Sequence, residues 1–393
     1  MRKRRGSRDF AIIQNNPPPP PGETRDPLQW PFAQNSIWNM PIGTGAVFVA
    51  ANLTRPVDPN DATGSNFAPF PFADNELICL TPTAPLRTIG YSSAAWTGAC
   101  RCDSTGSGAG FPKVVPIPDA WIVPHGNKNN SSAILAADGD TIREQQPFTR
   151  CPDSATRCSG GTTGNPTNPT SFDSSPDKSI RTSDGISGSH GGSHMSALGG
   201  AIRLGELRND TNNMRHAIKC ALFAAQFLYN GATNADCFRW PASSADSYAA
   251  TKYGTTSNAT NATNTNMKLG ALLAIPSTTN ITTMGLETVP AQKLAWTLQN
   301  YGCYVVDDNF GAGWLWNVET GFHTNAQGQS KLQEFQTDWG FAFEQRVNNG
   351  SLTTPWTRDT LKLIEALRCV SNNSPSTIGG GGAPLQPLAP PFA

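Results

Sequence analysis

The sequence DGISGSHGGSHMSALGGAIRLGEL, residues 184–207, is the stretch around which we interpret the rest of the chain. It contains seven glycines and two of the five histidines of the protein. Glycine tolerates positive φ angles and lets other groups come close to the backbone. The apolar–polar alternation at 201–204 then indicates a strand. We therefore predict an irregular loop that leads into a strand, and such loops on a rigid scaffold often carry binding and catalytic residues.

Composition narrows the class of protein. Charged residues make up 15% of the 393-residue chain and the net charge is zero, so there is no basic stripe and we expect no nucleic-acid partner. The 37 Gly and 32 Pro residues exceed their average combined share of about 12%, which favours turns and short strands over long helices. No apolar run approaches the roughly 18 residues of a membrane helix, so we expect no membrane span. These numbers predict a mainly β protein.

Local patterns predict the elements and the domain limits. Asp138-Gly139 between the apolar runs 133–136 and 141–143 predicts a hairpin. Further strands are expected at 36–39, 46–50, 120–123, 201–207, 269–275 and 303–306, and helices at 291–300, 331–335 and 357–369. No Pro/Gly linker divides 27–370, so we predict one domain between a disordered Pro-rich tail at 1–26 and a Gly/Pro-rich tail at 371–393. The low-complexity stretch 151–183 is expected to be a surface excursion.

The cysteines and the sequons favour secretion. Cys151 and Cys158, two of nine cysteines, flank a polar loop and predict a disulfide. No cysteine pair has zinc-ligand spacing, so we expect neither a metal nor a cofactor. The basic start of the chain lacks the apolar core of a signal peptide, which conflicts with secretion, but we favour an extracellular protein. The acceptor sites at Asn258 and Asn261 lie in a polar run and predict a glycosylated surface loop.

Several motifs, in order along the chain, resemble a family of secreted, mostly bacterial, uncharacterised proteins that are often attached to carbohydrate-binding or adhesive modules. The motifs are HGGS at 190–193, IRLGEL at 202–207, RHA at 215–217, RWPA at 239–242, LQNYG at 298–302, VDD at 306–308 and GGGG at 379–382. The resemblance implies a secreted, jelly-roll-like β-sandwich with long loops and a few short helices. It also implies a link to polysaccharides or cell-surface glycans, without an established activity.

The two histidines of the glycine-rich loop are four residues apart. On a helix this spacing would place both on one face, as in zinc proteases. The Gly-Gly-Ser between His190 and His194 opposes a helix, and no Glu follows the first histidine. We therefore interpret His190 as a general acid/base or hydrogen-bond donor, with a structural role as the alternative.

Glu206 and Asp307 each lie at the end of a predicted strand. Two carboxyl groups roughly 5–10 Å apart would suit glycoside hydrolysis, one as the acid and the other as nucleophile or base. The alternatives are an ion pair of Glu206 with Arg203 or Arg208, and a turn-capping role for Asp307 and its neighbour.

His216, Arg239 and Asp246 form a second set. Arg239 beside Trp240 would suit contact with a uronate, because the indole offers an apolar face and the guanidinium a bidentate fork. A lyase would then use His216 or Tyr248 as its base. The alternative is an Arg239–Asp246 ion pair beside a core tryptophan.

Trp314 and Trp316 are two residues apart and share one face of a strand. If that face is exposed, the pair is a sugar-stacking platform, and if it is buried, the pair belongs to the core.

The sequence thus predicts an extracellular glycoside hydrolase or polysaccharide lyase that acts on a polysaccharide or a cell-surface glycan. The residues assigned to catalysis are His190, Glu206, His216, Arg239 and Asp307, and those assigned to substrate binding are Trp240, Asp246, Trp314 and Trp316. The alternative from a different class is a non-enzymatic structural or adhesive glycoprotein that self-assembles or binds glycan.

Overall fold

The computed structural model describes residues 22–57, 68–96, 101–102, 104, 106–123, 129–151, 169–309, 311–347 and 351–393. Within these ranges, none of the helices has the length and apolar character needed to cross a membrane.

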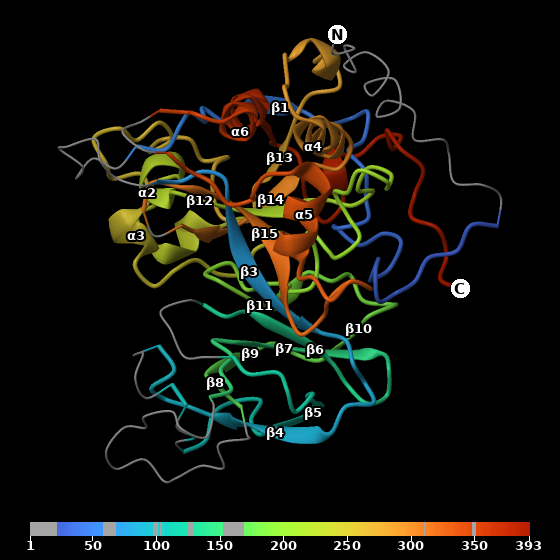
Figure 1. Cartoon of the computed structure of the whole chain (residues 1–393). Helices are drawn as coiled ribbons and strands as arrows, with labels where there is room; N and C mark the ends of the chain where they lie inside the picture. Colours follow the sequence, from blue (N-terminus) through green and yellow to red (C-terminus); the bar gives the residue numbers. More distant parts are fainter. Residues whose placement is uncertain are drawn as a thin grey trace.

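A mixed sheet of eleven strands organises the molecule (Figure 1). The strands follow one another across the sheet in the order β1 (Phe48–Ala50), β17 (Arg368–Val370), β13 (Leu272–Ala274), β14 (Cys303–Asp308), β12 (Ile218–Leu222), β15 (Trp314–Gly321), β3 (Phe72–Cys79), β6 (Ser132–Leu135), β7 (Thr141–Gln146) and β10 (Lys178–Ser179), and β9 (Asp173–Ser174) also pairs with β7. Three neighbouring pairs are parallel, namely β12 with β14, β15 with β3, and β3 with β6. Strand β3 therefore lies between two parallel neighbours near the middle of the molecule.

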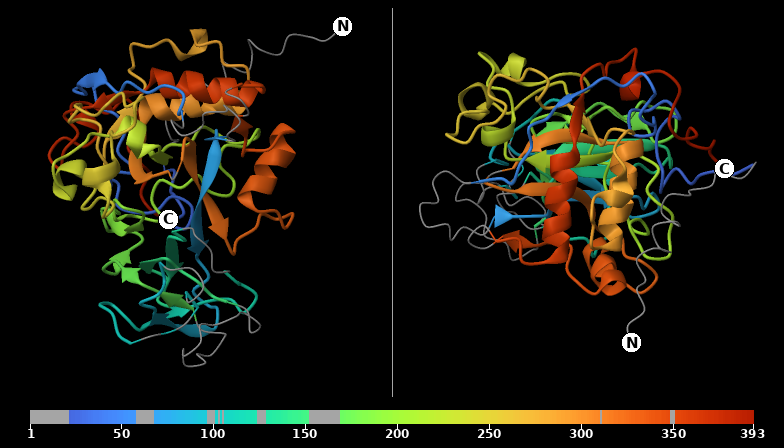
Figure 2. Two further views of the ribbon diagram at one scale, coloured as in Figure 1. Left: turned by 90° about the vertical axis from the view of Figure 1, so that its left-hand side faces the viewer. Right: turned by 90° about the horizontal axis from the view of Figure 1, so that it is seen from above.

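Helices cover one end of the sheet (Figures 1 and 2). Helices α4 (Val289–Asn300) and α6 (Pro355–Ala366) lie side by side, and α4 also packs on β13, while α5 (Lys331–Trp339) packs on β15. Helix α5 begins at a capping box of Ser330 and Gln333 and ends at Gly340, which has a φ of 78°. The shorter helical turns are α2 (Ala224–Phe227), α3 (Ala249–Lys252), η1 (Asn234–Cys237), η2 (Ile281–Thr283) and η3 (Ile378–Gly380).

A smaller lobe packs below the sheet (Figure 1). It contains the sheet of β5 (Lys113–Pro116), β4 (Leu86–Tyr91) and β8 (Thr170–Ser171), and elsewhere β16 (Arg346–Val347) pairs with β2 (Ala68–Pro69). A separate apolar cluster joins this lobe to β3 and β6 and includes Leu77, Cys79, Ile89 and Trp121. Because side chains alternate along a strand, Leu77 faces this cluster while Glu76 faces the opposite side of the sheet.

The mainly β class is confirmed, and the finer arrangement differs from expectation. The hairpin at Asp138-Gly139 forms β6 and β7, with Gly139 at a φ of 71°. A jelly-roll sandwich consists of antiparallel sheets, and the three parallel pairs of the main sheet do not show that arrangement. The strand predicted at 201–207 is wrong, since only Ile202 forms a bridge, to Val318 of β15. The predicted helix at 357–369 ends at Ala366, where β17 follows.

The predictions of two terminal tails are partly wrong, because described residues of both segments pack against residues distant in sequence. Gly43 and Gly45 donate backbone hydrogen bonds to Gly379 and Gly381, so the glycine-rich stretch packs against the start of the described chain. Arg25, 5% exposed, donates through its guanidinium to the carbonyl of Pro390. Residues 1–21 of the predicted N-terminal tail lie outside the described residues.

The predicted excursion at 151–183 also needs correction. Its residues 152–168, which include Cys158, lie outside the described part of the chain. Residues 170–179 contribute β8, β9 and β10 to the two sheets. Cys151 is bonded to Cys102, with a Cα–Cα distance of 5.9 Å, so the predicted partner Cys158 is wrong. That 27–370 forms one domain stays a prediction.

Candidate functional site

The register of the central strands places four polar side chains on one face of the sheet. Asn317 on β15 pairs with Asp74 on β3, and Glu76 follows two residues later on the same face. The antiparallel register of β12 with β15 puts Lys219 beside Asn317. This face therefore carries two carboxylates, an amide and an ammonium group on three adjacent strands.

A β-bulge adds Asp307 to the same face. The register between β12 and β14 shifts after Cys220, so that Ala221 pairs with Asp307 instead of Val306. Because side chains alternate along a strand, this one-residue shift turns Asp307 toward the face that carries Lys219.

The glycine-rich loop covers this face with its backbone. Strand β11 (Ser187–His190) ends at His190, and a turn follows in which Gly191 has a φ of 49°. A Cβ atom on Gly191 would lie closer than 3.0 Å to the Asp307 carboxyl, and one on Gly192 closer than 3.0 Å to that of Asp246. The Gly192 N–H donates to Asp307 Oδ1 at 3.1 Å. The two glycines let the turn sit directly on two carboxyl groups.

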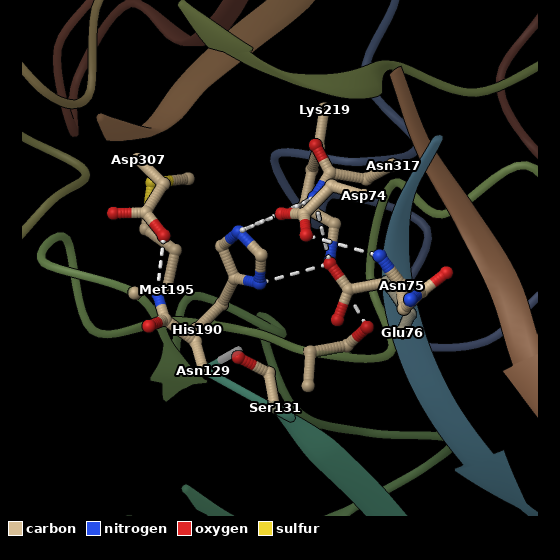
Figure 3. A network of polar contacts seen from close by, with 12 residues as sticks. Asp74, Asn75, Glu76, Asn129, Ser131, His190, Met195, Lys219, Asp307 and Asn317 are labelled. Atoms are coloured by element: carbon tan, nitrogen blue, oxygen red, sulfur yellow. Dashed lines mark hydrogen bonds and ion pairs between the residues drawn. The ribbon is translucent and has the colours of Figure 1, made fainter. Parts of the chain in front are cut away.

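Glu76 is the centre of a buried polar network (Figure 3). Its Oε1 lies 2.7 Å from Lys219 Nζ, 2.9 Å from His190 Nδ1 and 2.9 Å from Asn317 Nδ2. Asn317 Nδ2 also donates to Asp74 Oδ2 at 2.9 Å, and His190 Nε2 lies 3.5 Å from the same oxygen. The side chains of Glu76 and Lys219 are 0% exposed, whereas that of Asp74 is 25% exposed. Solvent therefore reaches the network at Asp74.

Glu76 and His190 favour their charged forms in spite of their burial. Burial by itself raises the pKa of Glu76, but His190 and Lys219 outweigh it and the net pKa is lowered. Burial by itself lowers the pKa of His190, but Glu76 and Asp74 together outweigh it and the net pKa is raised. For Lys219, burial lowers the pKa and the attraction of Glu76 opposes it only in part.

The neighbouring aspartates favour the protonated form. Burial raises the pKa of Asp307 well above its ordinary value, and the nearby Asp246 carboxylate raises it further. Burial also raises the pKa of Asp246, and it raises that of Asp308 to about 7. Asn129 Nδ2 donates to Asp307 Oδ2 at 2.7 Å, and the Tyr248 hydroxyl donates to Asp308 Oδ2 at 3.2 Å. The ionised cluster therefore lies next to carboxyl groups whose pKa values are raised.

Ligand atoms of Asp74, Glu76 and His190 lie within 4.8 Å of one another, which is close enough for all three to bind one divalent cation. The Lys219 ammonium group is 2.7 Å from Glu76 Oε1 and already neutralises that carboxylate. A cation bound there would be repelled by this ammonium group, so the donor set fits a metal poorly.

Of the residues assigned to catalysis, the structure brings His190 and Asp307 together and places the other three elsewhere. Glu206 Oε1 lies 2.8 Å from His216 Nε2, and Glu206 Oε2 accepts the backbone N–H of Arg203 at 2.7 Å. Glu206 is therefore ion-paired, but with His216 rather than with either arginine considered as its partner.

Arg239 does not form the ion pair considered for it. Its Nη2 donates to the carbonyls of Ser371 at 2.8 Å and Asn373 at 3.2 Å, while Asp246 lies against Gly192. Trp240 is partly buried and packs against the main apolar core.

The sugar-stacking platform is wrong, and the core alternative is confirmed. Trp314 and Trp316 are both 0% exposed and pack edge to face at 5.4 Å. Of the two acceptor sites, Asn258 is exposed. Asn261 is 1% exposed and its side-chain amide donates to the carbonyl of Ala51, which leaves no room for a glycan.

The sequence patterns did not single out Asp74, Glu76, Lys219 or Asn317. A signal was present for Lys219, which is the single charged residue in the apolar run IKCAL of β12. The alternation Asp74-x-Glu76 within β3 was a weaker signal, since it also fits the solvent face of a strand.

Comparisons of the chain with known protein families, with curated proteins and with solved structures found no match.

Proposed function

We propose that the face shared by Asp74, His190, Asp246 and Asp307 is the active site of a glycoside hydrolase that acts on an extracellular polysaccharide. One observation carries this proposal. The Asp246 and Asp307 carboxyls lie against two adjacent glycines, close to the solvent-accessible carboxylate of Asp74. The Cys102–Cys151 disulfide supports an oxidising, extracellular location.

Glycoside hydrolysis needs one protonated and one ionised carboxyl group near the scissile bond. The Asp246–Asp307 pair supplies the proton, because burial raises the pKa of both groups and the Asp246 carboxylate raises that of Asp307 further. This proton passes to the glycosidic oxygen as the bond between that oxygen and the anomeric carbon breaks.

Asp74 supplies the second carboxylate. Asn317 donates to it at 2.9 Å and the imidazole of His190 faces it at 3.5 Å, so both groups orient it. Asp74 either takes a proton from the water that attacks the anomeric carbon or attacks that carbon itself. The configuration of the product distinguishes these two routes.

Two features favour a hydrolase over the other functions considered. A lyase requires cationic groups that neutralise a uronate, but Arg239 is occupied by the carbonyls of Ser371 and Asn373, and the site is rich in carboxyl groups. The aromatic platform considered for glycan adhesion is not available, because Trp314 and Trp316 are buried.

The test compares the protein with Asp307→Asn and Asp74→Asn on a panel of neutral and uronic polysaccharides. We expect new reducing ends from a neutral polysaccharide, and a loss of at least about 100-fold in each variant. Asp119→Asn is the control, because that side chain is 68% exposed in the small lobe. Unsaturated products, an unchanged rate in Asp307→Asn, or no product from the folded native chain would each overturn the proposal.

A further inference from the structure

A second concave region adjoins the far end of the same sheet face. It is a groove of about 510 Å³. Its walls are residues 28–29, the turn at 203–208, and the end of β15 with the residues that follow it, 319–325. Its volume is within the range of about 300–1,000 Å³ found for ligand sites. Glu319 lies two residues beyond Asn317 on β15, so the groove begins about 7 Å from the buried network.

The charged groups of the groove neutralise one another. Arg203 Nε lies 2.8 Å from Glu319 Oε2, and Arg208 Nη1 lies 3.2 Å from Glu334 Oε1. His323 accepts a backbone N–H at 2.7 Å, and burial lowers its pKa, which favours the uncharged imidazole. This balance suits a neutral ligand, because an anion would have to displace a carboxylate from its arginine partner.

Three polar side chains of the lining are available to a ligand. Arg203 is 3% exposed, yet its Nη1 has no hydrogen-bond partner in the described part of the chain, which is rare for a buried donor. Gln29 and Thr324 line the same groove and are exposed, so their side chains are open to a ligand. Leu28 and Leu204 lie among these groups. A groove that offers both apolar contacts and hydrogen-bonding groups suits a sugar ring, which has apolar C–H faces and an edge of hydroxyl groups.

We propose that this groove is an accessory site that binds a neutral oligosaccharide stretch, separate from the site of bond cleavage. Gln29, Thr324 and Arg203 hydrogen-bond to sugar hydroxyls, and Leu28 and Leu204 contact the ring faces. The identification of the ligand as a glycan rests on the proposed function, whereas the preference for a neutral ligand rests on the groove alone. The site would hold the polysaccharide close to the catalytic aspartates.

The test uses full-length protein carrying Asp307→Asn, so that the ligand persists. Neutral oligosaccharides from the panel and oligouronates of equal length are titrated into it by calorimetry. We expect Gln29→Ala combined with Thr324→Val to weaken binding of the neutral ligand at least about 10-fold. Gln336→Ala, on the exposed side of the adjacent helix α5, is the control. Both altered groove positions avoid the buried ion pairs, so the folded state is retained.

Unchanged affinity in the groove variant, or stronger binding of the oligouronate, would overturn the accessory site. The hydrolysis assay reports separately on the proposed function. If the native chain releases no reducing ends while the groove variant loses binding, hydrolysis is refuted and the accessory site stands. If hydrolysis depends on Asp307 while the groove variant binds normally, the proposed function stands and the accessory site is refuted.

Discussion

Among the described residues, Lys219 and His190 are the two cationic groups that contact Glu76. Replacing Lys219 by methionine removes one of them and measures how much its buried ion pair with Glu76 contributes to stability. Both side chains are 0% exposed and their charged atoms are 2.7 Å apart. Breaking a buried ion pair on one side costs about 3–5 kcal/mol, because the remaining charge stays buried without its partner. Lys219 Nζ also donates to the carbonyls of Ser196 and Ala197 at 2.9 Å each, so we expect the upper half of that range.

The assay is urea unfolding followed by circular dichroism. Lys252→Met is the matched control, since that residue is exposed at the end of α3 and should change the free energy of unfolding by less than about 0.5 kcal/mol. Adding Glu76→Gln to Lys219→Met should recover part of the loss, because an uncharged amide is less costly to bury alone. A loss below about 1 kcal/mol in Lys219→Met, or a double variant whose loss equals the sum of the single losses, would refute the reasoning.

The same network predicts how stability depends on pH. The folded-state pKa of Glu76 is lowered, so its contribution is present above the ordinary value of 4.5 and is lost as the pH falls through the folded-state pKa. The folded-state pKa of His190 is raised, so its contribution is present below the ordinary value of 6.5 and is lost as the pH rises through the folded-state pKa. Both contributions are complete between these two values, and the urea midpoint should be highest there.

Other predictions address single residues. Gly191→Ala should lower stability by at least about 1–2 kcal/mol in thermal unfolding, because an alanine at its φ of 49° is strained and its Cβ would meet Asp307. Trp316→Ala should cost about 3–5 kcal/mol, since a large core side chain is lost, and a cost below about 1 kcal/mol would contradict its burial. Cys102→Ser opens a loop with a sequence separation of 49 and should cost about 4 kcal/mol, which denaturation with and without reductant checks. In a glycosylating host, mass spectrometry of the tryptic peptides should find Asn261 unmodified, because its amide is buried.

Elements that depend on neighbouring residues were predictable. The Asp138-Gly139 hairpin forms because its turn geometry is encoded in two adjacent residues. Helix α5 forms where Ser330 caps its first turn. The glycine-rich loop was predicted to carry functional residues, which stays a prediction, and its backbone contacts the Asp307 carboxyl.

Elements that depend on distant contacts were not predictable. The apolar–polar alternation at 201–204 is typical of a strand, but only Ile202 forms a bridge to a neighbouring strand. The glycine-rich C-terminal stretch has the composition of a linker, yet it packs on Gly43 and Gly45 because those backbones approach it closely. The spacing of Trp314 and Trp316 is the same whether their face of the strand is exposed or buried. The packing of the sheet determines that this face is buried.

The sequence by itself determined the β-rich class, the local turns and caps, and the residue types available for chemistry. The tertiary structure alone decided which of those residues meet. Asp307 reaches the site because a bulge opposite Ala221 shifts the register by one residue, and Asp74 and Lys219 meet through Asn317 because three strands from distant parts of the chain are aligned. Register is a property of paired strands, and a shift of one residue moves a side chain to the other face, so no pattern within one strand can specify it.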